Sequence, residues 1–168
     1  MIFLPQKALN LILELKDNFG IRDARVHQDG TVSVPGSVCL TAIGLKRLPC
    51  QFNVIDGDFL VSGNELESMH GFPRVVKKDL IACRNHLNTL VGGPVEVGGY
   101  YLVDQNPIRS FEGVAKVIGG ILSMRYVHHD FDLASMEHAG VCGDFITDRQ
   151  DIFDAWTKVI AQRSILSE

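Results

Sequence analysis

The chain has 168 residues, of which 46% are hydrophobic and 21% are charged, and its formal net charge at pH 7 is -4. This length and composition are typical of one globular domain, and they exclude a chain that is disordered over most of its length. The acidic balance argues against a general nucleic-acid binder, which needs clustered basic residues. The sequence contains no run of about 18 apolar residues, so it predicts no membrane-spanning helix.

The first predicted element is an amphipathic helix over residues 4–19, which Gly20 ends. Its apolar face is formed by Leu4, Ala8, Leu11, Ile12, Leu15 and Phe19. No basic leader precedes this stretch, so it is interpreted as a helix and not as a signal peptide. Asp29-Gly30 lies between two alternating runs and predicts a hairpin over residues 25–34. Residues 1–36 are therefore expected to form an N-terminal cap.

A 21-residue repeat follows the hairpin and decides the fold. Its blocks are residues 37–57, 58–78, 79–99 and 100–120, with a longer fifth block over 121–143 and a sixth that begins at Asp144. Each block opens with an apolar–x–apolar alternation, which predicts a strand. A block is too short for a strand and a full helix. We therefore expect one short strand, an Asn-containing turn and an irregular return in each coil.

Five apolar columns recur at this spacing and predict a continuous core, because no block can bury its apolar residues alone. The columns are Val38, Phe59, Leu80, Tyr101, Leu122 and Phe145; Leu40, Val61, Ala82, Val103 and Met124; Leu45, Leu66, Leu87 and Ile108; Leu48, Met69, Leu90 and Phe111; and Ile55, Val76, Val97 and Ile118. The strands at 38–40, 59–61, 80–82, 101–103 and 122–124 should be parallel, in register and about 4.8 Å apart. Asn64, Asn85 and Asn106 form a polar column that should bind the backbone of adjacent coils.

The order of these columns resembles the leucine-rich repeat. Its positions are filled by Phe59, Val61, Asn64, Leu66 and Met69; by Leu80, Ala82, Asn85, Leu87 and Leu90; and by Tyr101, Val103, Asn106, Ile108 and Phe111. The first and fifth blocks depart from the pattern, with Ile43 and Val127 in place of Asn.

The closer resemblance is to short leucine-rich-repeat proteins of tailed bacteriophages. Residues 68–78, 89–99 and 110–120, the lead-in at residues 29–34 and the segment at residues 44–59 are similar to that family, and the likeness covers about residues 25–125. It implies a leucine-rich-repeat-like fold and a phage origin, and it implies little about function.

The fifth block gathers possible metal ligands. They are His128, His129, Asp130, Asp132, His138 and Cys142. Their composition suits zinc or iron, but their spacing fits no familiar metal motif, and a bulged surface loop also explains the polarity of a lengthened block. We therefore expect no metal and no cofactor.

Cysteine chemistry offers little more. The four cysteines, Cys39, Cys50, Cys83 and Cys142, have no CxxC spacing, so reduced thiols in a cytosol are the default. A Cys83–His86 nucleophile pair would lack an orienting third group. The sequence predicts no enzyme.

A second amphipathic helix is expected over residues 149–168, with Thr147 or Asp148 as its N-terminal cap. Its apolar residues are Ile152, Phe153, Trp156, Val159 and Ile160. Either terminal helix could bind a partner, but a solenoid needs its ends covered. The acidic bias after residue 130 is explained by a solvated cap, or by an end that attracts a basic partner. The expected organisation is thus a single domain with residues 37–148 as the solenoid between two caps.

Strand alternation directs a further set of side chains outward. The first outward row is Cys39, Leu60, Ile81, Leu102 and Ser123, and the second is Thr41, Ser62, Cys83, Asp104 and Arg125. An aliphatic stripe of Leu60, Ile81 and Leu102 beside a polar row has the character of a protein interface. Apart from Thr41, these residues are the predicted partner-binding site.

The sequence thus favours a phage-encoded protein-binding module in the cytoplasm of an infected bacterial host. An inhibitor of a host or host-defence protein, with an anti-defence role, fits such a module, and neither nucleic acid nor membrane is an expected partner. Two alternatives stay open: a small metal-dependent enzyme that uses the His-rich fifth repeat, and a self-assembling structural phage component, since a homo-oligomer is possible.

Overall fold

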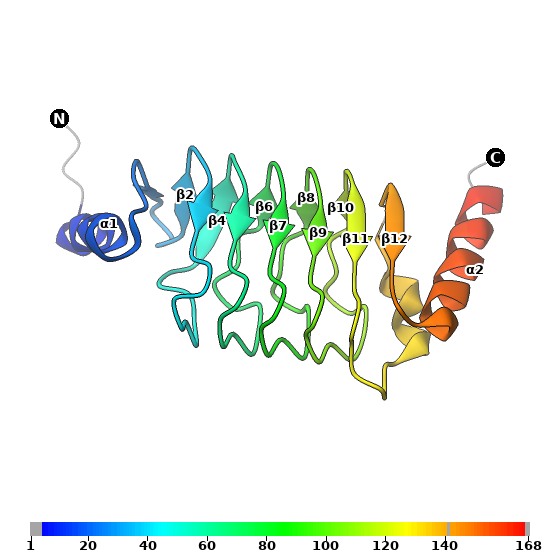
Figure 1. The fold of residues 1–168 in the computed structure, drawn as a ribbon. Coiled ribbons are helices and arrows are strands. Elements are labelled where there is room, and N and C mark those ends of the chain that lie inside the picture. Colours follow the sequence, from blue (N-terminus) through cyan, green and yellow to red (C-terminus); the bar gives the residue numbers. More distant parts are fainter. Residues whose placement is uncertain (1–4, 141, 167–168) are drawn as a thin grey trace.

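Successive coils of the chain stack along one axis between two terminal helices (Figure 1). The computed structural model describes residues 5–140 and 142–166. Most hydrogen bonds between coils join backbone groups about one repeat apart, such as the 2.8 Å bond from Phe59 N to Asp79 O. The predicted β-rich solenoid is confirmed. None of the described helices is long and apolar enough to cross a membrane.

The opening strands of the coils form one parallel sheet, which we call the opening sheet. In spatial order its strands are β3 (Val38–Cys39), β5 (Phe59–Leu60), β7 (Leu80–Ile81), β9 (Tyr101–Leu102), β11 (Ile121–Ser123) and β12 (Asp144–Ile146). Phe59 pairs with Val38 on one side and with Leu80 on the other, which is the predicted register. Each strand is short because the chain must turn twice within 21 residues.

The returning segments form a second sheet that the sequence reasoning missed. This return sheet contains β1 (Arg25–Val26), β2 (Val32–Val34), β4 (Phe52–Ile55), β6 (Val75–Val76), β8 (Glu96–Val97) and β10 (Val117–Ile118). The expectation of one strand and an irregular return per coil is therefore wrong. Paired β-branched residues such as Val75-Val76 favour extended backbone, and they were the available signal. Among the described strands, only β1 and β2 pair antiparallel, which confirms the hairpin.

The five apolar columns fill the space between the two sheets. All their members are buried except Leu45, which is half-buried in the first coil, where a neighbouring coil covers one side only. Phe59 makes edge-to-face contacts with Phe52 and Phe72, with ring centroids 5.3 and 5.6 Å apart. The core is thus continuous from coil to coil, as the repeat predicts.

The asparagine column forms the expected ladder inside the turns. The Asn106 amide donates from Nδ2 to Ala82 O of the preceding coil at 2.9 Å and to Val103 O of its own coil at 3.0 Å. Its Oδ1 accepts from Asn85 N and Leu87 N, each at 3.1 Å. One buried side chain therefore satisfies backbone groups of two coils, which ties their turns together.

The N-terminal cap contains α1 (Gln6–Phe19), which ends at Gly20 with φ 67°. Ala8 and Leu15 are buried, and Leu11, Ile12 and Phe19 are half-buried, so the predicted face is the packed one. Leu4, which was assigned to the same face, lies outside the described residues.

The C-terminal cap consists of α2 (Gln150–Leu166) and the 3-10 helix η1 (Leu133–His138). Ile152 is buried and the Trp156 ring lies 5.3 Å from that of Phe145, but Phe153 is 38% exposed. The fifth block is therefore more than a surface loop, since Ser135 and Met136 of η1 are buried.

The candidate capping residues divide between two roles. Thr147 Oγ1 accepts a 3.2 Å bond from Arg149 N, next to the start of α2. Asp148 instead accepts from Tyr126 N of the preceding coil at 2.9 Å. Asp148 therefore fastens the last coil to the fifth one.

Candidate functional site

The predicted outward rows lie on the outer face of the opening sheet, but not all of their side chains are accessible. Leu60, Ile81 and Leu102, which we call the aliphatic row, are half-buried and follow one another along β5, β7 and β9. Cys39 and Thr41 are exposed on the first coil. A half-buried aliphatic row of this kind offers apolar contact area without forming part of the core.

Two predicted site residues are buried, contrary to the expectation of solvent-facing positions. Ser123 is 3% exposed and Asp104 is 7% exposed. The Ser123 hydroxyl donates to Asp104 Oδ1 at 2.7 Å, so each covers the other. Neither side chain can be a primary contact for a partner, and both instead support the residues around them.

All members of the second row except Thr41 line a hollow of about 460 Å³, which we call the corner hollow. Its lining combines four predicted residues with three that the sequence reasoning missed: Ser62, Cys83, Asp104 and Arg125, and then Arg84, Gln105 and Tyr126. The missed residues each follow a second-row residue directly, at the corner where the opening strand turns away. The hollow therefore lies beside the aliphatic row and extends from the second coil to the fifth.

A column of left-handed residues forms this corner. Its members and their φ angles are Ala42 (55°), Gly63 (69°), Arg84 (55°), Gln105 (58°) and Tyr126 (59°). This conformation is costly for residues that carry a Cβ atom, and glycine is its usual occupant. The first two coils carry small residues here, whereas the last three carry large side chains with polar end groups. Strained positions that hold large side chains are typical of functional surfaces.

The sequence could not reveal this column, because its five residues share no side-chain chemistry. Tyr126 is 63% exposed, more than any other large hydrophobic side chain among the described residues. The Arg84 side chain donates from Nε to Gln105 Oε1 at 2.6 Å, which holds both corner side chains in place. The corner thus presents a fixed arginine and an exposed tyrosine.

An ion pair forms the floor of the hollow. Asp104 Oδ2 accepts from Arg125 Nη2 at 2.7 Å and from Nε at 3.2 Å, and Asp104 Oδ1 accepts from Arg125 N at 2.8 Å. Burial opposes ionisation of this carboxyl group, but the hydrogen bonds from Arg125 and Ser123 outweigh that cost and hold the Asp104 pKa below its usual 3.8. Asp104 is therefore charged at neutral pH and positions the Arg125 guanidinium.

We expect this pair to make stability depend on pH in the acid range. Because the folded-state pKa of Asp104 lies below the unfolded value, its contribution is fully present above the unfolded pKa and is lost as the pH falls through the folded one. Asp104→Asn should lower the free energy of unfolding at pH 7 by about 1–3 kcal/mol. Urea unfolding from pH 7 to pH 3 measures the difference, which should shrink in acid. A difference that stays constant over this range contradicts the assignment.

The possible metal ligands of the fifth block do not form a well-prepared site. His128, His129 and Asp130 lie together, with His129 Nε2 3.3 Å from Asp130 Oδ2 and the two rings stacked 4.2 Å apart. Both ring nitrogens of His128 face N–H donors, Arg109 Nη2 at 2.9 Å and Asp130 N at 3.1 Å. Burial, followed by Arg109 and His129, lowers the His128 pKa. A cation would have to compete with a guanidinium for the same lone pair.

The remaining candidates of that block serve the fold. Asp132 accepts a 3.0 Å bond from Ala134 N and caps η1, and His138 ends the same helix. Cys142 is half-buried, and burial raises its pKa. None of these three belongs to the His128 cluster among the described residues.

Cysteine nucleophiles are also poorly supported. Burial raises the pKa of Cys83, and it raises that of Cys50 to about 12, so both are thiols at neutral pH. Within the described residues, no hydrogen bond joins Cys83 to His86, the pair that the sequence suggested. The Cys83 side chain instead lines the corner hollow.

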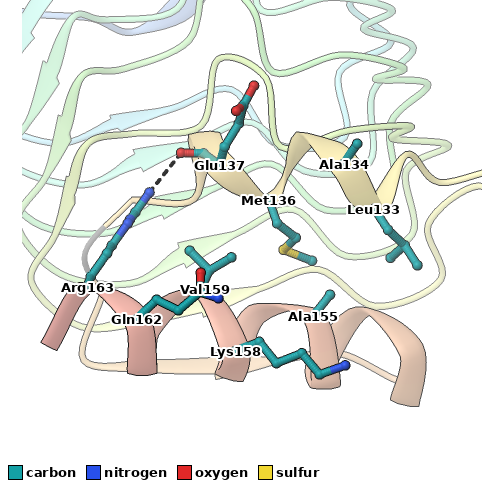
Figure 2. A pocket seen from close by; sticks show the side chains of 9 residues that line it. All are labelled: Leu133, Ala134, Met136, Glu137, Ala155, Lys158, Val159, Gln162 and Arg163. Atoms are coloured by element: carbon teal, nitrogen blue, oxygen red, sulfur yellow. Dashed lines mark hydrogen bonds between the residues drawn. The ribbon is translucent and has the colours of Figure 1, made fainter. Parts of the chain in front are cut away.

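A second hollow, of about 470 Å³, lies between η1 and α2 (Figure 2). Met136 of η1 and Val159 of α2 contribute apolar side chains to it. Arg163 donates to the carbonyl oxygens of Ala139 and, at 2.8 Å, of Glu137. These bonds satisfy carbonyl groups at the end of η1 and fasten α2 to it. We interpret this groove as the seam of the C-terminal cap.

No family model, curated protein or solved structure matches this chain. The outward rows and the corner hollow are therefore the features from which a function can be inferred.

Proposed function

We propose that this chain is a protein-binding module whose contact surface combines the aliphatic row with the corner hollow. The observation that carries the proposal is the exposed Tyr126, held in a left-handed backbone conformation beside Arg125. Tyrosine and arginine are the residue types that most often dominate the energy of protein interfaces. The adjacent aliphatic row supplies apolar area, and the polar residues around it supply the rim.

The resemblance to bacteriophage proteins supports a partner from the infected bacterium. We propose a host or host-defence protein, which the module inhibits by covering part of its surface in the cytoplasm. A stack of coils that is hydrogen-bonded from one coil to the next suits this role, because little conformational entropy is lost when a rigid surface binds.

The proposal predicts that two outward substitutions abolish binding while the fold is kept. In the double variant Leu60→Glu, Leu102→Glu, two charges enter a half-buried aliphatic row that lies outside the core. Loss of two central contacts at about 2 kcal/mol each corresponds to a loss of affinity of roughly a thousandfold. Affinity capture from infected cells, followed by calorimetry with the captured protein, measures the change.

The matched control places glutamates on the return sheet and the loop before it. The double variant Val91→Glu, Val117→Glu adds the same two negative charges as the Leu60, Leu102 variant. It alters two side chains that are 48% and 53% exposed. Equal capture by both double variants, with unchanged thermal midpoints, would remove the aliphatic row from consideration. If the row instead packs on a second copy of the chain, the wild-type protein will be a dimer in solution and the Leu60, Leu102 variant a monomer.

A further inference from the structure

The hydrogen bonds around the corner hollow use most of its side-chain acceptors but leave several of its side-chain donors free. The acceptors are used within the protein: Asp104 receives four bonds, from the Ser123 hydroxyl and from the backbone and side chain of Arg125. Gln105 Oε1 accepts from Arg84 Nε. A ligand that offers only donors would therefore find few partners in the hollow.

The donors, in contrast, are incompletely used. Among the described residues, no acceptor is bonded to either terminal nitrogen of Arg84, to Nη1 of Arg125 or to Nε2 of Gln105. All three side chains line the same hollow. Because its Nε is fixed by Gln105, the Arg84 guanidinium is partly immobilised with its two outer N–H groups available. That arrangement suits a planar acceptor with two oxygens.

The charges of the hollow limit what this acceptor can be. Arg125 is neutralised by Asp104 at 2.7 Å, so Arg84 is left as the single uncompensated charge of the lining. The carboxylate of Asp148 accepts a hydrogen bond from the backbone of the lining residue Tyr126, and the whole chain carries a formal charge of -4. One positive charge in acidic surroundings matches a monoanion and disfavours a polyanion such as nucleic acid.

We infer that the corner hollow recognises a single carboxylate group on a segment of the protein partner. An aspartate or glutamate side chain of that segment accepts two hydrogen bonds from Arg84 and a third from Gln105 or Arg125. Its apolar neighbours contact Ile81 and Leu102, the last residues of β7 and β9, which precede the lining residues Cys83 and Asp104 by two positions in the chain. This inference rests on the proposed function and specifies the chemistry of the partner.

Nuclear magnetic resonance titration with short peptides tests the inference without knowledge of the partner. The probes are acetyl-Leu-Glu-Leu-amide and its Gln counterpart, added to the ¹⁵N-labelled full-length chain. We expect the Glu peptide to shift the Nε–Hε signal of Arg84 and the side-chain amide of Gln105, and to bind about tenfold more tightly than the Gln peptide. Arg84→Gln should remove that preference.

The matched control is Arg109→Gln, an exposed arginine that bonds to His128 outside the hollow and should leave the preference unchanged. Equal binding of the two peptides, equal effects of the two arginine variants, or no shift at Arg84 with either peptide would overturn the inference. Competition by inorganic phosphate that exceeds competition by acetate would reassign the hollow to phosphorylated partners. If the Leu60, Leu102 variant loses partner capture but the wild-type chain shows no preference for the Glu peptide, the proposed binding function stands and only the carboxylate inference is refuted.

Discussion

Replacing Leu87 with alanine is expected to lower the free energy of unfolding by about 2–5 kcal/mol. Leu87 is fully buried in the third coil, with Leu66 and Ile108 of its own column on either side. The substitution removes apolar burial and leaves a cavity that two stacked neighbours cannot easily close. Because each coil is stabilised by the next, the loss should weaken the second and fourth coils as well. Urea unfolding gives the size of the effect, and hydrogen exchange shows how far it extends.

Val91→Ala is the appropriate comparison, since it removes methyl groups from a side chain that is 48% exposed in the same coil. We expect its effect to stay within about 0.5 kcal/mol. Similar losses in the two variants would contradict a central, buried position for Leu87.

Asn106→Ala should be nearly as damaging, although it deletes no apolar contact. The Asn106 side chain is 1% exposed, and its Oδ1 accepts from the backbone amides of Asn85 and Leu87. Without it these two buried amides lose their acceptor, at about 1–3 kcal/mol each. We expect faster hydrogen exchange at both amides, together with a lower midpoint of thermal unfolding.

The matched substitution is Asn88→Ala, at an exposed asparagine whose side chain makes no hydrogen bond among the described residues. It should change neither measurement. Protection of the Asn85 and Leu87 amides in the Asn106 variant would show that the ladder contributes little.

The core was predictable because the repeat places chemically similar residues at the same position in every coil. Phe59, Leu80 and Tyr101 differ in shape, yet all are apolar, so their shared burial follows from spacing alone. The return strands escaped prediction because only one of their positions, that of Val76 and Val97, is regularly apolar, whereas the position before it varies, with Glu96 and Val117 in the same register as Val75. Regular chemistry is thus visible in sequence, whereas regular backbone geometry is not.

The candidate site was only half predictable for the same reason. Alternation along the strands correctly assigned Ser62, Cys83 and Arg125 to the outer face, since they line the corner hollow. It could not foresee that Ser123 and Asp104 bury one another through a bond between neighbouring coils. Nor could it identify the left-handed corner, where conformation rather than residue type is conserved along the stack.

The parallel stacking of the coils also limits the conformation of any segment that lies along the axis. Adjacent strands are about 4.8 Å apart, so equivalent side chains two coils apart, such as Leu60 and Leu102, are separated by about 9.6 Å. A β-strand presents the same face every two residues, about 6.6 Å, which is out of step with the coils. A polyproline II helix presents the same face every three residues, about 9.3 Å, which nearly equals two coils. The spacing of every second coil therefore matches the repeat of a polyproline II helix more closely than that of a β-strand.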